Sequence, residues 1–572
     1  MTTELAKRIW ASKYRHTGES TINDTWSRVA RSIAATEHDP NTHAREFHWI
    51  LSSYRFLPGG RVLAGAGTGK QVTLFNCFVA GRLLDSIEKI FESLKETAIT
   101  MQQGGGIGVD FSALRPAGTA AVRTGSVASG PLSFMHMWDL LCRTLLATSA
   151  RRGAMMGTLR CDHPDITEFV DAKRVAGDLE NFNLSVLVTD AFMQAIDDDA
   201  EWPLAYPPGT GRTKSWLPAR ELWQRIVRSA HETAEPGLLF IDTINRENNL
   251  HYCEHISATN PCGEVPLPPY GACNLGSVNL TAFVTDPFSA QCVFDKDRLR
   301  ETVRIAVRFL DDVIDVSRFP LNKQAKQARA TRRIGLGVTG LADTLAMLGF
   351  HYDSDAGREF AVRTMEIIRN TAYATSIELA KEKGAFPRFL KDDFVDSPFV
   401  QRLPAELRDG IADAGIRNSH LLAIAPAGTI SLLAHNISSG VEPIYALEAE
   451  RAVRTSNGGV ERLEVYDYAY GLWLESHDGT EKVPDVFVTA NELPATAHLE
   501  MQACLQPFVD AAISKTINLS PDATAADVEE AFRYAWRSGV KGCTVYRPGA
   551  RSGQVLRALA DAHCCHIDRE AD

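Results

Sequence analysis

The chain has 572 residues, of which 45% are hydrophobic and 23% charged, with a formal net charge of −11. It is long enough for several domains or one large barrel, and its negative charge argues against a general nucleic-acid-binding surface. No apolar run reaches about 18 residues, so we expect no membrane span. The polar start also lacks an apolar signal core, and we expect a cytoplasmic protein with no membrane or nucleic-acid partner.

Residues 1–50 are predicted to form amphipathic helices. Leu5, Ile9 and Trp10 recur at helical spacing, and so do Trp26 and Ile33. A glycine-rich loop region follows at residues 54–69. We therefore treat residues 1–50 as an N-terminal helical region.

From about residue 75 to 545, short apolar runs alternate with longer helical stretches. Apolar runs that read as buried strands are residues 74–79, 183–188, 237–241 and 421–425. Alternation of this kind is typical of an α/β fold with mostly parallel strands. No linker rich in serine, glycine or proline divides the region, so one barrel-like domain over residues 51–556 is favoured. Residues 557–572 are polar and predicted to be a flexible tail.

Two glycine motifs do not fit the nucleotide-binding fingerprints that they resemble. The G-x-G-x-x-G at residues 335–340 follows a basic segment, whereas the dinucleotide fingerprint needs a buried strand before it. We interpret it as a tight turn before a helix. The loop at residues 65–71 has Gln71 where a Walker A loop needs a serine or threonine.

The eleven cysteines are too sparse for a disulfide scaffold, and no Cys-x-x-Cys pair occurs. The adjacent Cys564 and Cys565, between two histidines, are badly placed to hold one tetrahedral ion together. We predict no metal ligands in the chain.

The segment from Asn260 to Glu264 is the most informative part of the sequence. It places an amide, a thiol and a carboxyl at Asn260, Cys262 and Glu264, on one side of an extended segment. A second thiol, Cys273, follows after prolines and glycines that forbid a helix. These groups on one short loop indicate redox or radical chemistry.

Three further segments are candidate parts of the same site. Cys77 lies within an apolar run, where an inert core thiol is the alternative. The glycines of residues 104–108 permit close approach of a ligand to the backbone. Residues 425–431 follow a predicted strand and could cradle a phosphate, or form a plain strand-to-helix turn.

These segments together resemble the ribonucleotide reductase family, and most closely its adenosylcobalamin-dependent class II enzymes. The resemblance covers about residues 50–556 in order. It is carried by residues 75–78, 104–109, 151–157, 162–166, 260–280, 334–340, 425–431 and 541–547. It implies a ten-stranded α/β barrel of the ribonucleotide reductase and glycyl radical type. It also implies an oxidoreductase that makes 2′-deoxyribonucleotides, the precursors of DNA, from ribonucleotides, with diphosphates favoured.

The resemblance also assigns catalytic roles. Cys262 would carry the thiyl radical, Glu264 would be the general base, and Asn260 would orient the substrate. Cys77 and Cys273 would be the reducing pair, which predicts Cα atoms within about 7 Å of each other.

Binding roles follow from the same resemblance. Substrate would be bound by Asn76, Gly105, Pro426, Ala427, Gly428, Thr429, Ile430 and Ser431. Deoxynucleotide or ATP specificity effectors would be bound at the interface of a homodimer by Asp85, Ser86, Ile87, Arg151 and Arg152. Cys564 and Cys565 would relay electrons from thioredoxin or glutaredoxin, unless another protein does so.

The class follows from what the sequence lacks. Class I large subunits carry a Tyr-Tyr pair near the C-terminus and class III enzymes a glycyl radical motif, and neither occurs here. This leaves adenosylcobalamin as the cofactor. A class I large subunit that needs a separate radical-generating subunit remains the alternative, followed by a non-catalytic nucleotide-binding regulator. The N-terminal sequence is too short for an ATP-cone domain, so we expect no on/off control by ATP and dATP.

Overall fold

The structure is a computed structural model that describes residues 3–121, 126–146, 154–207, 209, 211–454, 460–477 and 481–550. Among the residues singled out above, Arg151, Arg152, Cys564 and Cys565 lie outside these ranges.

A ten-stranded mixed sheet forms the centre of the molecule, as predicted. Its strands are β1 (Phe56–Pro58), β2 (Cys77–Val79), β3 (Gly106–Asp110), β6 (Met155–Arg160), β7 (Phe182–Val188), β10 (Gly237–Phe240), β13 (Ala272–Asn279), β16 (Ile334–Thr339), β19 (Thr516–Asn518) and β20 (Gly542–Tyr546). Strands β2, β3, β6, β7 and β10 are parallel to their neighbours in this series, whereas β13 pairs with β2 in the antiparallel sense.

The sheet closes into a ring through two extended segments. Residues 421–425 form an isolated bridge to β16 at Leu336 and another to Ile513, just before β19. The predicted strand at 421–425 is an extended segment that forms backbone hydrogen bonds to both neighbours without a continuous ladder. The predicted turn at residues 335–340 is instead mostly strand β16. A Cβ on Gly337 would lie 2.5 Å from the carbonyl oxygen of Ala423, so glycine is needed there for the two backbones to meet.

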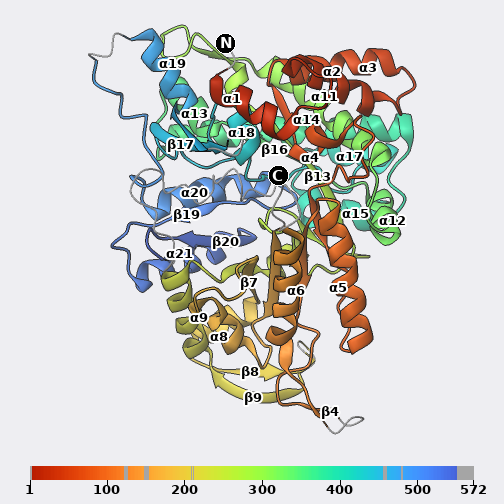
Figure 1. Cartoon of the computed structure of the whole chain (residues 1–572), viewed down its shortest axis with the longest axis vertical. Coiled ribbons are helices and arrows are strands. Elements are labelled where there is room, and N and C mark those ends of the chain that lie inside the picture. Colours follow the sequence, from red (N-terminus) through yellow and green to blue (C-terminus); the bar gives the residue numbers. More distant parts are fainter. Residues whose placement is uncertain are drawn as a thin grey trace.

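Helices surround the ring, with α2 and α3 of the N-terminal region next to α11 at one end of the view in Figure 1. The longer helices are α2 (Ile22–Ala34), α3 (Pro40–Ser52), α5 (Ile87–Gln102), α6 (Gly130–Leu146), α8 (Asp190–Asp197), α9 (Ala219–Thr233), α11 (Lys296–Val316), α12 (Asn322–Thr331), α14 (Asp355–Lys383), α17 (Ala405–Ala414), α19 (Tyr468–Ser476), α20 (Ala495–Leu505) and α21 (Ala525–Arg537). Helix α2 shows why the N-terminal prediction succeeded, because its periodic Trp26, Val29 and Ile33 are all buried. Within the described residues, no helix is both long and apolar enough to cross a membrane.

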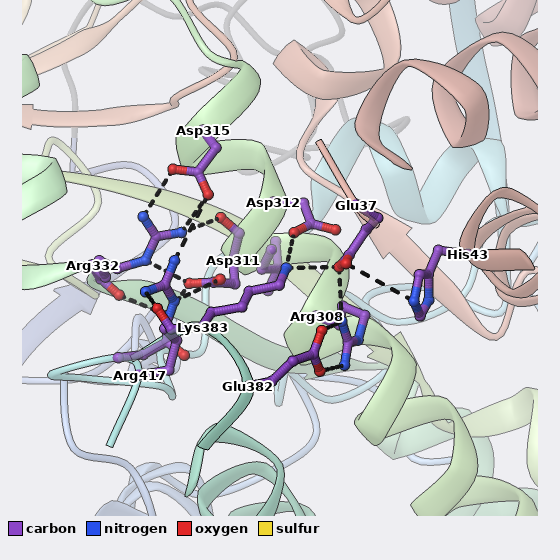
Figure 2. Close-up of polar contacts among 12 residues, drawn as sticks. Glu37, His43, Arg308, Asp311, Asp312, Asp315, Arg332, Glu382, Lys383 and Arg417 are labelled. Atoms are coloured by element: carbon purple, nitrogen blue, oxygen red, sulfur yellow. Dashed lines mark hydrogen bonds and ion pairs between the residues drawn. The ribbon is translucent and has the colours of Figure 1, made fainter. Parts of the chain in front are cut away.

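A buried network of charges fastens the N-terminal helices to the barrel (Figure 2). Lys383, the last residue of α14, donates to Glu37 at 2.7 Å and to Asp312 of α11 at 2.8 Å. The side chains of Glu37 and Asp312 are 1% and 0% exposed. Burial opposes the ionisation of Glu37, but hydrogen bonds from Lys383 and Arg308 hold the pKa of this carboxyl well below its usual value.

The neighbouring acidic cluster of Asp311, Asp312 and Asp315 is also neutralised by protein cations. Arg332 donates to Asp311 at 2.8 Å and to Asp315 at 2.8 Å, and Arg417 donates to Asp311 at 3.1 Å. All three carboxylates are thus paired with side-chain cations, since Asp312 is bound by Lys383, and we interpret the cluster as structural.

Replacement of Lys383 by methionine should lower the free energy of unfolding by about 3–5 kcal/mol, because it leaves the buried Asp312 without its cation and Glu37 paired with Arg308. Urea denaturation of the purified variant measures this loss. Lys381→Met on the same helix is the control, since Lys381 forms an exposed pair with Glu378 and its loss should cost under about 0.5 kcal/mol. Equal destabilisation by the two variants would contradict the assigned role of the network.

Candidate active site

A hairpin passes through the interior of the barrel and carries the segment from Asn260 to Glu264. Its strands are β11 (Ala258–Thr259) and β12 (Pro266–Leu267). The backbone of β3 lies directly against it, since a Cβ on Gly108 would be 1.8 Å from the carbonyl oxygen of Thr259. On the other side, the N–H of Ala512 donates to the carbonyl of Glu264 at 2.9 Å. The glycines of β3 thus make room for the backbone of this hairpin. The sequence had predicted that they make room for a ligand.

Cys77 lies between the side chains of Asn260 and Glu264. The Asn260 amide donates to the Cys77 sulfur at 3.3 Å, and the Cys77 thiol donates to Glu264 Oε1 at 3.7 Å. The spacing of the segment predicted an extended conformation. The structure has a turn at residues 260–263, so the two side chains meet at Cys77 because the chain folds back.

Cys77 and Cys273 lie directly opposite each other on the antiparallel strands β2 and β13. Opposed residues in such a pair have Cα atoms about 4.5–5.5 Å apart, which is within disulfide range. The predicted proximity is therefore met, and both cysteines are free thiols here.

Burial sets the protonation of these groups. It raises the pKa of Cys77 well above its usual value, and the nearby Glu264 carboxylate raises it further. Burial likewise raises the pKa of Cys273. It raises the pKa of Glu264 to about 7, although hydrogen bonds from Asn260 and Cys77 oppose the shift. Both thiols are thus protonated at neutral pH, while Glu264 is near its midpoint and suited to accept a proton.

Cys262 lies at the apex of the turn, half-buried, where it lines two cavities. The smaller, of about 40 Å³, is also lined by Asn76, Cys77, Asn260 and Glu264. Asn76 Oδ1 and Glu264 Oε2 are buried there without a hydrogen-bond partner among the described residues. Unpaired buried oxygens are costly, so this cavity is suited to a ligand that donates hydrogen bonds.

The larger cavity, of about 1080 Å³, lies on the other side of Cys262. Its walls come from β7, β10 and β20, from Lys515 and Thr516, and from Glu442. This volume is at the upper end of the range for small-molecule sites.

The predicted phosphate-binding residues lie between the two cavities. Pro426 lines both, Ala427 and Ile430 line the smaller, and Gly428 and Ser431 line the larger. Thr429 is buried and lines neither of them. The loop is braced by Ser439, whose hydroxyl accepts the N–H of Ala427 at 2.7 Å.

Two other groups of predicted residues have simpler surroundings. Gly105 packs against the ring of Phe78, with no room for a Cβ, and lines neither cavity. Asp85 accepts hydrogen bonds from Arg115 at 2.6 Å and from the Tyr206 hydroxyl at 3.1 Å. Ser86 caps helix α5 and Ile87 is exposed. Their binding roles stay predictions.

Sequence reasoning missed two contacts beside the site. Lys515, whose side chain is fully buried, forms an ion pair with Glu442 and lies 2.8 Å from His498 Nδ1. Asn183 of β7 donates to the carbonyl of Pro261 at 2.9 Å. A polar residue within the apolar run at 183–188 was the available signal for Asn183.

Two family models match the chain. The ribonucleotide reductase barrel domain matches residues 75–546, and the ribonucleotide reductase all-alpha domain matches residues 1–71.

Relatives cover nearly the whole chain. A vitamin B12-dependent ribonucleoside-diphosphate reductase from Mycobacterium tuberculosis (strain CDC 1551 / Oshkosh) is 42% identical over 95% of this chain and 78% of its own length. The enzyme of the same name from Thermoplasma acidophilum is 41% identical over 94% of this chain and 69% of its own. A ribonucleoside-diphosphate reductase subunit alpha from Chlamydia muridarum is 27% identical over 94% and 57%, respectively. With the geometry of the cysteines and both domain matches, this similarity establishes that the chain belongs to the ribonucleotide reductase family.

Proposed function

We propose that the chain reduces ribonucleoside diphosphates to 2′-deoxyribonucleoside diphosphates with adenosylcobalamin as its cofactor. The observation that carries the proposal is that one cavity is lined by Cys77, Asn260, Cys262 and Glu264, and that Cys273 lies directly opposite Cys77 on the neighbouring strand. A nucleotide-binding regulator would have no use for two opposed thiols beside a buried carboxyl.

Each residue has a definite task in this reaction. Cys262, as a thiyl radical, removes the 3′-hydrogen of the ribose, and Glu264 takes the proton of the 3′-hydroxyl. The 2′-hydroxyl leaves as water. Cys77 and Cys273 together give up two electrons and two protons and become a disulfide. Asn260 holds Cys77 at 3.3 Å, so that this thiol is fixed beside the base.

The larger cavity is where we place the cofactor, which supplies the radical that activates Cys262. The cavity of about 1080 Å³ beside Cys262 is larger than most small-molecule sites, as a bulky cofactor requires. Glycine, serine and threonine residues of β7, β10 and β20 contribute small side chains to its walls. The names of the Mycobacterium and Thermoplasma relatives favour this assignment over a class I large subunit, which would receive its radical from another protein.

We also propose a homodimer formed through helices α5 and α6, which contact each other and stand side by side in Figure 1. Three residues at or near the start of α5 are exposed and apolar, as is one residue of α6: Leu84 (48%), Ile87 (63%), Phe91 (49%) and Leu140 (62%). A specificity effector would bind at the edge of this face, near Asp85. A thioredoxin-like protein would restore the Cys77–Cys273 pair through Cys564 and Cys565.

An assay of the purified chain tests the function. With CDP or ADP, dithiothreitol and adenosylcobalamin, we expect the deoxynucleotide, and none without the cofactor. Added deoxynucleotides should change the preference between the two substrates. Product formed only after a radical-generating subunit is added would show a class I enzyme instead.

If the tail relays electrons, the double variant Cys564→Ser with Cys565→Ser should lose turnover driven by thioredoxin and keep turnover driven by dithiothreitol.

The reducing pair can be identified by trapping its oxidised form. Pre-reduced protein that turns over without external reductant should stop once its thiols are consumed, and peptide mapping should then find Cys77 joined to Cys273. Cys77→Ser and Cys273→Ser should each abolish repeated turnover. Cys292→Ser, which changes a partly exposed cysteine outside the site, is the control and should behave as wild type. A disulfide joining other barrel cysteines would refute the pairing.

The raised pKa of Glu264 predicts the pH dependence. A base must be ionised to act, so kcat/KM should fall about tenfold per pH unit below its pKa of about 7. A solvent-exposed glutamate would show this fall only below about pH 4.3. Glu264→Gln should lower kcat by about 10²–10⁴-fold, whereas Glu221→Gln, an exposed carboxylate on α9, should leave the profile unchanged. A wild-type profile that is flat from about pH 5.5 to 8 would contradict the assigned base.

A further inference from the structure

The turn that presents Cys262 has a definite type. The N–H of Gly263 donates to the carbonyl of Asn260 at 3.1 Å, which closes a four-residue turn with Pro261 and Cys262 at its centre. Gly263 has φ +86°, whereas Cys262 keeps a negative φ. Proline at the second position fixes a negative φ there, which leaves types I and II, and the negative φ at the third residue selects type I.

Types I and II differ by a flip of the central peptide, here the peptide that joins Pro261 to Cys262. The flip would turn the Pro261 carbonyl by about 180° and give Cys262 a positive φ, which redirects its Cβ and sulfur. The hydrogen bond that closes the turn is common to both types, so it does not favour either one. A hydrogen bond to the Pro261 carbonyl does favour one type, because the flip reverses the direction of this carbonyl.

Asn183 makes that contact. Its amide donates to the Pro261 carbonyl at 2.9 Å from strand β7, on the opposite wall. The side chain is exposed to the larger cavity and does not line the smaller one. Asn183 therefore contacts the peptide between Pro261 and Cys262 from the side of the larger cavity.

We propose that Asn183 is a positioning residue, which holds the turn in type I and so fixes the direction of the Cys262 thiol. Asn183 also lines the larger cavity, so a ligand that contacted it there would be linked to the direction of the thiol through one hydrogen bond. The role in turnover rests on the proposed function, whereas the effect on the thiol does not.

Asn183→Ala removes the donor, and Asn183→Asp keeps the shape but presents oxygens to the carbonyl. We expect Asn183→Ala to lower kcat about three- to tenfold with KM for the nucleotide unchanged, and Asn183→Asp to lower it further. Asn322→Ala is the control, because Asn322 is an exposed asparagine on α12 that lines neither cavity. Thermal unfolding midpoints should match wild type for both Asn183 variants.

A second measurement needs neither cofactor nor turnover. Iodoacetamide alkylation of Cys262 in the cofactor-free protein, followed by peptide mass spectrometry, should be at least about threefold faster in Asn183→Ala, because the released turn exposes the sulfur in more conformations. Wild-type alkylation rates in both Asn183 variants, or the same increase in Asn322→Ala, would overturn the proposal. If wild-type protein failed to reduce nucleotides, the proposed function would fall while this measurement still decided the role of Asn183.

Discussion

The close approach of two backbones, β3 and the hairpin that crosses the barrel, is the constraint on which the site depends. With 1.8 Å between a Cβ on Gly108 and the Thr259 carbonyl, any side chain at Gly108 would displace the hairpin. Such a displacement would carry Asn260 and Glu264 away from Cys77, which belongs to the neighbouring strand β2. The lack of a side chain at Gly108 therefore fixes the position of the catalytic segment relative to the barrel wall.

The barrel also supplies the chemical environment of these groups. Cys77, Cys273 and Glu264 are all buried, and burial disfavours the charged form of each. A thiol that stays protonated can donate hydrogen directly, because it is not held as a stable thiolate. A carboxyl group whose pKa is near the ambient pH can both accept and return a proton. Burial stabilises the fold, and it also sets the protonation state of these three reactive groups.

Local pattern predicted the parts of the fold that depend on short-range order. The helices near Trp26 and the strands at 183–188 and 237–241 follow from periodicity and apolar runs. The apolar run at 421–425 predicts an extended segment, but sequence does not show which neighbours it pairs with. Gly335 and Gly337 predict a turn, since a glycine that admits another backbone looks the same in sequence as one that bends the chain.

The candidate site was likewise predictable from the sequence only in part. The functional groups of residues 260–264 were visible as residue types, but their turn was not, because it depends on contacts from β3, β7 and Ala512. Cys77 and Cys273 are 196 residues apart in the sequence, so only family resemblance could pair them. Asn183 and Lys515 act through long-range contacts that no local spacing encodes.

The seam of the ring has a consequence of its own. Residues 421–425 exchange backbone hydrogen bonds with both neighbours, with Leu336 on one side and with Ala512 and Ser514 on the other. Buried segments with complete backbone pairing open only at high free energy. The loop at 425–431, which separates the two cavities, therefore starts from a fixed point, and any change in the width of the passage between the cavities must come from the loop itself.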